Sequence, residues 1–179
     1  VNAVMFGAEL VAGLLAGSVA LLADSLDMLG DSLVYAFSLY VVARGPVYKA
    51  RAAAAKAGVM GVFGLFVLGQ LIYKVLTPQV PAVGMMGVVG TIALAANGFC
   101  FVLLWRHRAE DINMRSVWIC SRNDLIANAS VLLAALAVWA TGSAWPDIAA
   151  GALICFVFLR SSFLVAREAR RELRLVHHR

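Results

Sequence analysis

The stretch Ala23-Asp24-Ser25-Leu26-Asp27-Met28-Leu29-Gly30-Asp31-Ser32 places three carboxylates inside a long apolar part of the sequence. The whole chain has 179 residues, of which 63% are hydrophobic and only 14% are charged. A soluble domain carries about 25% charged residues. Apolar stretches of about 20 residues, the length that crosses a bilayer as a helix, recur along the chain. We therefore predict an all-α integral membrane protein, in which the three acids require a physical explanation.

The apolar stretches predict six membrane-spanning helices joined by short loops. The predicted spans cover approximately residues 2–16, 20–43, 57–76, 82–105, 114–140 and 147–165. We expect residues 1–170 to form one transmembrane domain and residues 171–179 to form a basic cytoplasmic tail. No segment outside the spans is long enough to bury the core of a separate soluble domain.

The basic residues predict how the chain is oriented in the membrane. Most Lys and Arg residues follow the second, fourth and sixth spans, whereas the turns after the first, third and fifth spans contain none. Because cytoplasmic loops carry the excess of Lys and Arg, both termini are predicted to be cytoplasmic. The second span then runs from the outer surface inward. The net charge of +5 follows from this topology and does not indicate nucleic-acid binding.

The three acids of the second span are predicted to share one helix face. At about 100° per residue, Asp24, Asp27 and Asp31 lie within about 60° of one another. Asp27 and Asp31 are one turn apart, so their carboxylates can meet at one cation. They lie about 10 and 16 Å from the outer end of the span, near the middle of a core about 30 Å thick. Asp24 lies one turn further outward, where we predict a gate or proton-pathway residue.

The fifth span supplies a second polar stripe at a similar depth. Cys120, Asp124 and Asn128 lie within about 40° of a common line along this helix. Two acids from the second span, with Asp124 and a thiolate, would give four ligands for a divalent ion. Zn²⁺ accepts both sulfur and oxygen ligands, and thiolate favours softer ions. Close carboxylates repel one another, so at least one should hold a proton that a metal ion then displaces.

Some of these assignments have alternatives. Cys120 could simply be a small buried hydrophobic residue. Asn123 and Asn128 are expected to support the site, and either could complete an oxygen-rich metal site in place of the thiol. Glu9 in the first span is a further supporting or proton-pathway residue. Arg122 points away from Asp124 and could pair with Glu9 instead.

Other polar and small residues are predicted to serve the fold. Asp147 follows Trp145-Pro146 and is expected to be the N-terminal acid of the sixth span, with a role in metal entry or release as the alternative. Asn2 and Asn97 are expected to form hydrogen bonds between helices. Glycines at three-residue spacing are expected to allow close helix packing within one subunit, or to form a dimer seam; they are Gly58, Gly61 and Gly64, and Gly84, Gly87 and Gly90.

Two motifs resemble spans of a known family. Residues 17–31, with Ala23-Asp24 followed by Asp27 and Asp31, resemble the second span of the cation diffusion facilitator family, and Cys120-Ser121-Arg122-Asn123-Asp124 resembles its fifth span. The resemblance implies a homodimeric secondary transporter, not an enzyme. It implies export of a divalent metal, Zn²⁺ first and then Cd²⁺ or Co²⁺, in exchange for protons by alternating access. The implied ligands are Asp27, Asp31, Asp124 and the residue four before Asp124.

This reading places the chain in a bacterial inner membrane, with metal ions, protons, lipid and a second copy as partners and with no resident cofactor. In most zinc transporters of the family the position of Cys120 is His, and many have His at Asp27. Transport of Mn²⁺ or Fe²⁺ is therefore the alternative within the class. We also expect a short form that lacks the family's cytoplasmic metal-binding domain.

The alternatives from other classes are a non-transporting protein and an enzyme. In the first, the buried acids would pair with Arg122 and Lys74 only to hold helices together. An intramembrane metalloenzyme is disfavoured because no histidine lies in a predicted span and no HExxH motif is present.

Overall fold

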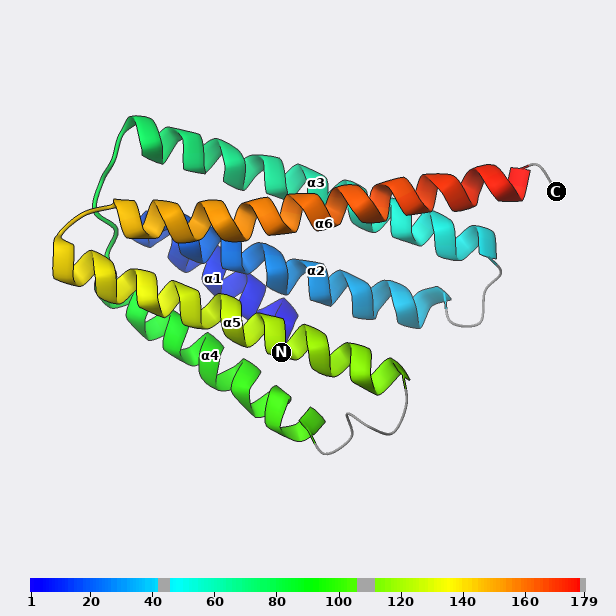
Figure 1. The fold of residues 1–179 in the computed structure, drawn as a ribbon, viewed down its shortest axis with the longest axis horizontal. Coiled ribbons are helices and arrows are strands. Elements are labelled where there is room, and N and C mark those ends of the chain that lie inside the picture. Colours follow the sequence, from blue (N-terminus) through cyan, green and yellow to red (C-terminus); the bar gives the residue numbers. More distant parts are fainter. Residues whose placement is uncertain (42–45, 106–111, 178–179) are drawn as a thin grey trace.

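The structure, a computed structural model, describes residues 1–41, 46–105 and 112–177, which contain six α-helices (Figure 1). They are α1 (Asn2–Ala16), α2 (Val19–Val41), α3 (Pro46–Leu76), α4 (Val83–Trp105), α5 (Ile112–Thr141) and α6 (Trp145–His177). Some side chains within these helices lie outside the description, namely those of residues 35, 38–41, 46–47, 49–50, 104, 112–123, 168–170 and 172–177. The predicted all-α membrane fold is confirmed.

Within the residues that the structure describes, four of the six helices contain a segment long and apolar enough to cross a membrane. These segments are Arg51–Leu76, Val83–Leu103, Asp124–Thr141 and Trp145–Arg167. Helix α1 is apolar but has only 15 residues. Helix α2 carries its three aspartates in its first half and middle. The end of the bundle that holds the α1–α2 turn is called the outer end below, after the orientation that the sequence predicts. All six predicted helices are present. The two that lack an ordinary membrane-spanning segment are α1 and α2, and these two helices carry Glu9 and the three aspartates.

Two helices extend well beyond their predicted spans. Helix α3 begins at Pro46 rather than near residue 57, and α6 continues to His177 rather than ending near residue 165. The added residues are rich in Ala, Lys, Arg, Glu and Leu, which favour helix even where no lipid surrounds them. At 31 and 33 residues, these helices are about 46 and 50 Å long, which exceeds a hydrocarbon core of about 30 Å. The segment predicted as a tail at 171–179 is therefore helical as far as His177.

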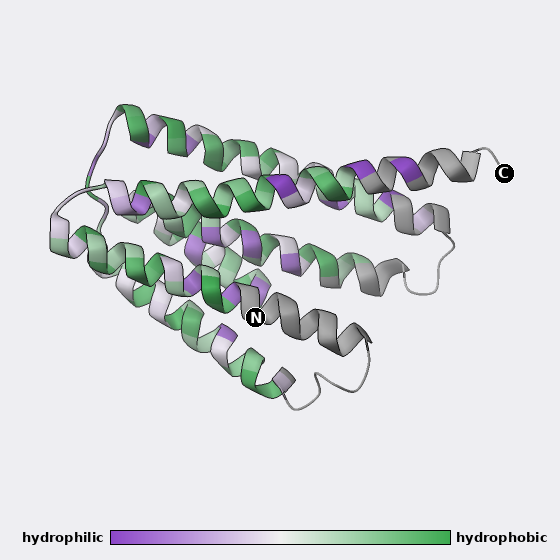
Figure 2. Ribbon diagram, in the orientation of Figure 1, coloured by the Kyte–Doolittle hydropathy of each residue, from purple (hydrophilic) through white to green (hydrophobic). Residues whose placement is uncertain are grey.

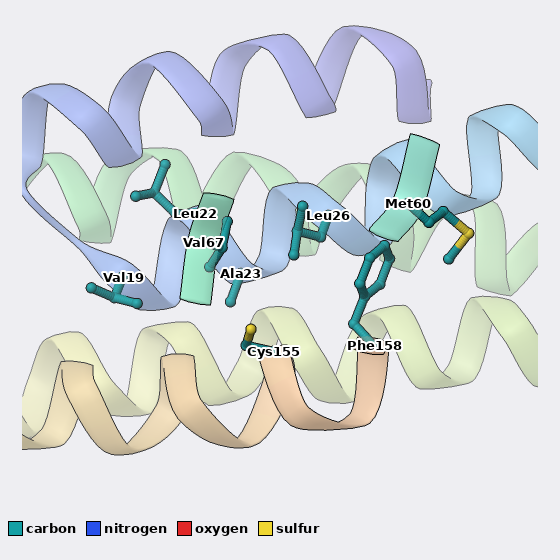
Figure 3. Packing of buried hydrophobic residues seen from close by; sticks show 8 residues of the cluster. All are labelled: Val19, Leu22, Ala23, Leu26, Met60, Val67, Cys155 and Phe158. Carbon is teal, nitrogen blue, oxygen red and sulfur yellow. The ribbon is translucent and has the colours of Figure 1, made fainter. Parts of the chain in front are cut away.

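Helix α2 lies at the centre of the bundle. Helix α3 packs along α6, α4 along α5 and α1 along α2, while α2 also contacts α3, α5 and α6 (Figure 1). One face of α2 joins an apolar cluster with α3 and α6 (Figure 3) that consists of Val19, Leu22, Ala23, Leu26, Met60, Val67, Cys155 and Phe158. With this face occupied, the acidic face of α2 is left to meet α1 and α5. Figure 2 shows hydrophilic positions on α2 and on the coloured part of α5 near the middle of the bundle.

The two glycine rows, at 58, 61 and 64 on α3 and at 84, 87 and 90 on α4, contain both packed and open positions. Gly64 lies tightly against Leu159 of α6, and Gly90 lies tightly against Leu132 of α5. The other four glycines, at 58, 61, 84 and 87, have nothing within 4 Å of where a side chain would begin. Packing within the chain therefore explains one member of each row.

Candidate metal centre

Asp27 and Asp31 of α2 meet Asp124 of α5 in the middle of the bundle. The carboxyl groups of Asp27 and Asp31 each lie within hydrogen-bonding reach of the Asp124 carboxyl group. Asp124 is only 7% exposed, and the two α2 acids are half-buried. The one-turn spacing of the α2 pair lets a single acid on α5 face both. The sequence placed these three acids at a similar depth, and their role as metal ligands stays a prediction.

Groups from two other helices act on Asp31. The Asn2 side chain donates a hydrogen bond from Nδ2 to Oδ2 of Asp31 at 3.2 Å. The positive charge of Lys56 on α3 is close enough to attract the same carboxylate. The expectation that Asn2 bonds between helices is confirmed, and its partner is a candidate metal ligand. Asn97 also contacts α2, through Nδ2 at 3.8 Å from the Met28 sulfur.

The predicted four-ligand set remains a prediction. Among the side chains that the structure describes, no group of three or more His, Cys, Asp or Glu is arranged so that it could hold a metal ion. The side chains of Cys120, Arg122 and Asn123 lie outside the described residues. Helix α5 includes these positions, and Cys120 lies one turn before Asp124 on it.

A second polar group lies outward of the three aspartates. Glu9, Asp24 and Asn128 are all 0% exposed, and they come from α1, α2 and α5. Asn128 donates a hydrogen bond from Nδ2 to the backbone oxygen of Asp124 at 2.8 Å. Both carboxylate oxygens of Glu9, both of Asp24 and Oδ1 of Asn128 have no hydrogen-bond partner.

Sequence reasoning missed a third polar cluster at the outer end of the bundle. Asp147 lies in the first turn of α6 as predicted, but its carboxylate bonds to the start of α2. It accepts hydrogen bonds from Ser18 Oγ at 2.6 Å, Val19 N at 2.9 Å and Ala20 N at 3.1 Å. Asp147 is therefore an N-cap supplied to α2 from a different helix.

Lys74, which the non-transporting alternative paired with the buried acids, lies in this cluster and pairs with Asp147. Its Nζ lies 3.8 Å from Asp147 Oδ2 and donates a hydrogen bond to the Gly17 carbonyl. The sequence held a signal for this pair. Lys74 is a single basic residue at the outer end of a span, next to turns that carry no Lys or Arg. A buried cation requires an acid as its ion-pair partner, so a nearby buried acid could be expected.

An apolar helical bundle with carboxylates gathered at its centre is typical of membrane proteins that move ions or protons. Residues 1–174 match the family described as the cation efflux transmembrane domain. The chain therefore belongs to the cation efflux family, also called the cation diffusion facilitators, as the two motifs indicated. Members of this family are transporters of metal cations and not enzymes. No curated protein matches the chain.

Proposed function

We propose that this transporter exports a divalent metal cation, Zn²⁺ first and then Cd²⁺ or Co²⁺, across a bacterial inner membrane in exchange for protons. The observation that carries the proposal is the meeting of Asp27 and Asp31 with Asp124 inside an apolar bundle. The metal is the substrate, and the proposal requires no resident cofactor. Intramembrane acids that face a bundle interior mark ion or proton pathways.

Exchange with protons follows from the cost of charge in the bundle. One ionised Asp at the centre of a membrane helix costs about 2.5–3.5 kcal/mol on insertion scales, and three adjacent ones also repel one another. The cluster is therefore stable either with protons bound or with a cation bound. A divalent ion that enters must displace protons, and protons must return before the empty cluster can change its access. Alternating access of this one site to the two sides then couples the two fluxes.

The metal preference turns on the fourth ligand. Cys120 lies one turn inward of Asp124 on α5, and a thiolate there would favour Zn²⁺ and Cd²⁺. One observation favours the alternative, a transporter of Mn²⁺ or Fe²⁺. Next to the cluster, the described Asn128 holds an amide oxygen without a hydrogen-bond partner, and the acids themselves offer oxygen. Hard divalent ions prefer such a set.

We also propose that the transporter works as a homodimer. Gly58 and Gly61 on α3 and Gly84 and Gly87 on α4 have open space where a side chain would be. In lipid, small residues allow the helices of two copies to approach closely. Single-molecule photobleaching in proteoliposomes should give two bleaching steps per particle when each chain carries one dye. A distribution dominated by single steps would contradict the dimer.

Transport by purified protein in proteoliposomes tests the main proposal. A panel of Zn²⁺, Cd²⁺, Co²⁺, Mn²⁺ and Fe²⁺ is offered across an imposed pH gradient, and metal flux is measured with and without the gradient. We expect flux that depends on the gradient and is abolished by Asp31→Asn and by Asp124→Asn. Ser32→Ala is the matched control, because Ser32 is next to Asp31 and its described hydrogen bond runs to the Met28 carbonyl of its own helix.

Two results would count against this function. Wild-type flux in either aspartate variant would show that the site is wrongly assigned. If detergent-solubilised protein releases no protons when metal is added, and Asp27→Ala changes nothing, the acids serve only to hold helices together.

A further inference from the structure

Glu9, Asp24 and Asn128 hold five oxygen atoms that are buried and have no hydrogen-bond partner. Among the side chains that the structure describes, no other buried nitrogen or oxygen atom is in this condition. Nearly all buried polar atoms in proteins are paired, so each exception requires an explanation. Here the unpaired atoms belong to three side chains, and all five atoms are oxygens that can accept a hydrogen bond.

The register of the α1–α2 hairpin places Glu9 beside Asp24. Asn2 bonds to Asp31 at the inner end of this hairpin, and Gly13 lies tightly against Leu22 at the outer end. Between these two fixed points, Glu9 on α1 falls level with residues 24–26 of α2. The charges of Glu9 and Asp24 accordingly lie close enough to repel each other.

Asn128 approaches the same place from α5. It lies four residues after Asp124, so it is on the same helix face and about 6 Å further outward. Asp24 lies outward of Asp27 by one turn of α2, which runs in the opposite direction. Asp124 interacts electrostatically with both Asp24 and Asp27. The two outward steps, along α2 and along α5, therefore lead to one level of the bundle.

Four described donors on the surrounding helices are used elsewhere. Ser25, the neighbour of Asp24, donates to the Leu22 carbonyl at 2.7 Å. The Asn128 amide nitrogen donates to the Asp124 backbone, and the Asn97 amide contacts the Met28 sulfur. Lys74 is engaged at the outer end with Asp147 and Gly17. The five acceptors, which the register brings to one level of the bundle, therefore receive no donor from these groups.

We propose that Glu9, Asp24 and Asn128 form a second divalent-cation subsite, one helical turn outward of the aspartate cluster. One proton can bridge only two of the five acceptors, whereas a hard divalent ion takes about six oxygen ligands. The subsite contains no sulfur, so it favours ions such as Mn²⁺ over Cd²⁺. The inference rests on the proposed function, because the subsite is where an exported ion stops after it leaves Asp27, Asp31 and Asp124.

Equilibrium binding of Mn²⁺ alone tests the subsite. Free Mn²⁺ is measured by electron paramagnetic resonance during titration of purified wild-type protein, an inner variant (Asp31→Asn with Asp124→Asn) and an outer variant (Glu9→Gln with Asp24→Asn). Wild-type protein should bind two equivalents per chain. Each variant should bind one, and the fourfold variant should bind none. Ser25→Ala is the control, since Ser25 is equally buried and should leave two equivalents.

The near-isosteric substitutions remove buried charge and so favour a folded bundle, and a monodisperse elution profile confirms this. Asn128→Ala gives a second measure that leaves both acids in place. It should weaken Mn²⁺ binding at the outer subsite by about tenfold, because the ion loses one ligand. One equivalent in wild-type protein that the outer variant retains would overturn the subsite and leave the proposed function intact. No bound Mn²⁺, Zn²⁺ or Cd²⁺ in wild-type protein would overturn both.

Discussion

Replacement of Asp147 by Ala should strongly destabilise the transporter although it lies outside the candidate metal centre. The change removes the acceptor for Ser18 Oγ, Val19 N and Ala20 N and leaves Lys74 without its acid. Each buried donor left without a partner costs about 1–3 kcal/mol. Breaking a buried ion pair from one side costs about 3–5 kcal/mol. Because the carboxylate no longer has to be desolvated and Lys74 keeps its bond to Gly17, we expect a net loss of about 3–5 kcal/mol.

Two further variants separate the cap from the charge. Asp147→Asn keeps one acceptor oxygen for the start of α2 but loses the charge, so it should cost about half as much as Ala. Lys74→Met removes the cation that Asp147→Asn would leave unpaired. The double variant should therefore lose less than the sum of the two single variants, with a coupling energy of about 1–3 kcal/mol.

Unfolding in mixed micelles of dodecylmaltoside and sodium dodecyl sulfate, followed by tryptophan fluorescence, gives the free energies. Thr91→Ala serves as the control, since its hydroxyl donates to the Gly87 carbonyl of its own helix, α4. The assignment of Asp147 as the cap of α2 would be refuted if Asp147→Ala changed stability by less than about 0.5 kcal/mol, the range of ordinary surface substitutions.

Four other variants test separate features. Gly151→Ala should destabilise the bundle by about 1–3 kcal/mol in the same assay, because a side chain there would meet the Val19 backbone at 2.8 Å; an unchanged midpoint would contradict this close contact of α6 with α2. Gly142→Ala should cost about 1–2 kcal/mol through its left-handed backbone alone, at φ 63° with nothing within 4 Å, so the equivalent D-alanine should restore stability. Asn2→Ala should weaken metal binding about tenfold by releasing Asp31, which isothermal titration would show, and a constant affinity would mean that the hydrogen bond does not position the ligand. Cys120→Ser should weaken Cd²⁺ flux more than Mn²⁺ flux; equal effects would remove Cys120 from the ligands.

Much of the fold could be predicted because lipid imposes simple rules. The number of helices, the bounds of α1 and the shared face of Asp27 and Asp31 follow from hydropathy and from 100° per residue. Asp124 could be matched to Asp31 because both depths are measured along straight helices. The inner start of α3 and the end of α6 could not be predicted in this way. Hydropathy marks where lipid ends, whereas helix propensity decides where the helix ends.

The cluster around Asp147 could not be predicted from the sequence for a different reason. The sequence shows Asp147 at the start of its own helix, where an acid is expected to interact with that helix's N-terminus. Its actual bonds go to Val19 and Ala20, which depend on how closely α6 and α2 pack at Gly151. Likewise, the burial of Glu9 and Asp24 without partners depends on the hairpin register, which a six-span outline does not contain.

The cap that Asp147 places on α2 also bears on how the chain is made. Synthesis proceeds from the N-terminus, so α2 enters the membrane long before the residue that binds its first amide groups exists. At that stage Ser18 can serve the amide of Leu21 within its own turn, but the amides of Val19 and Ala20 must wait for α6. The helix that carries three acids is therefore completed only when the last helix of the chain arrives. We expect the α1–α2 hairpin to remain close to water or to the insertion machinery until then, and chains that end before α6 to be degraded.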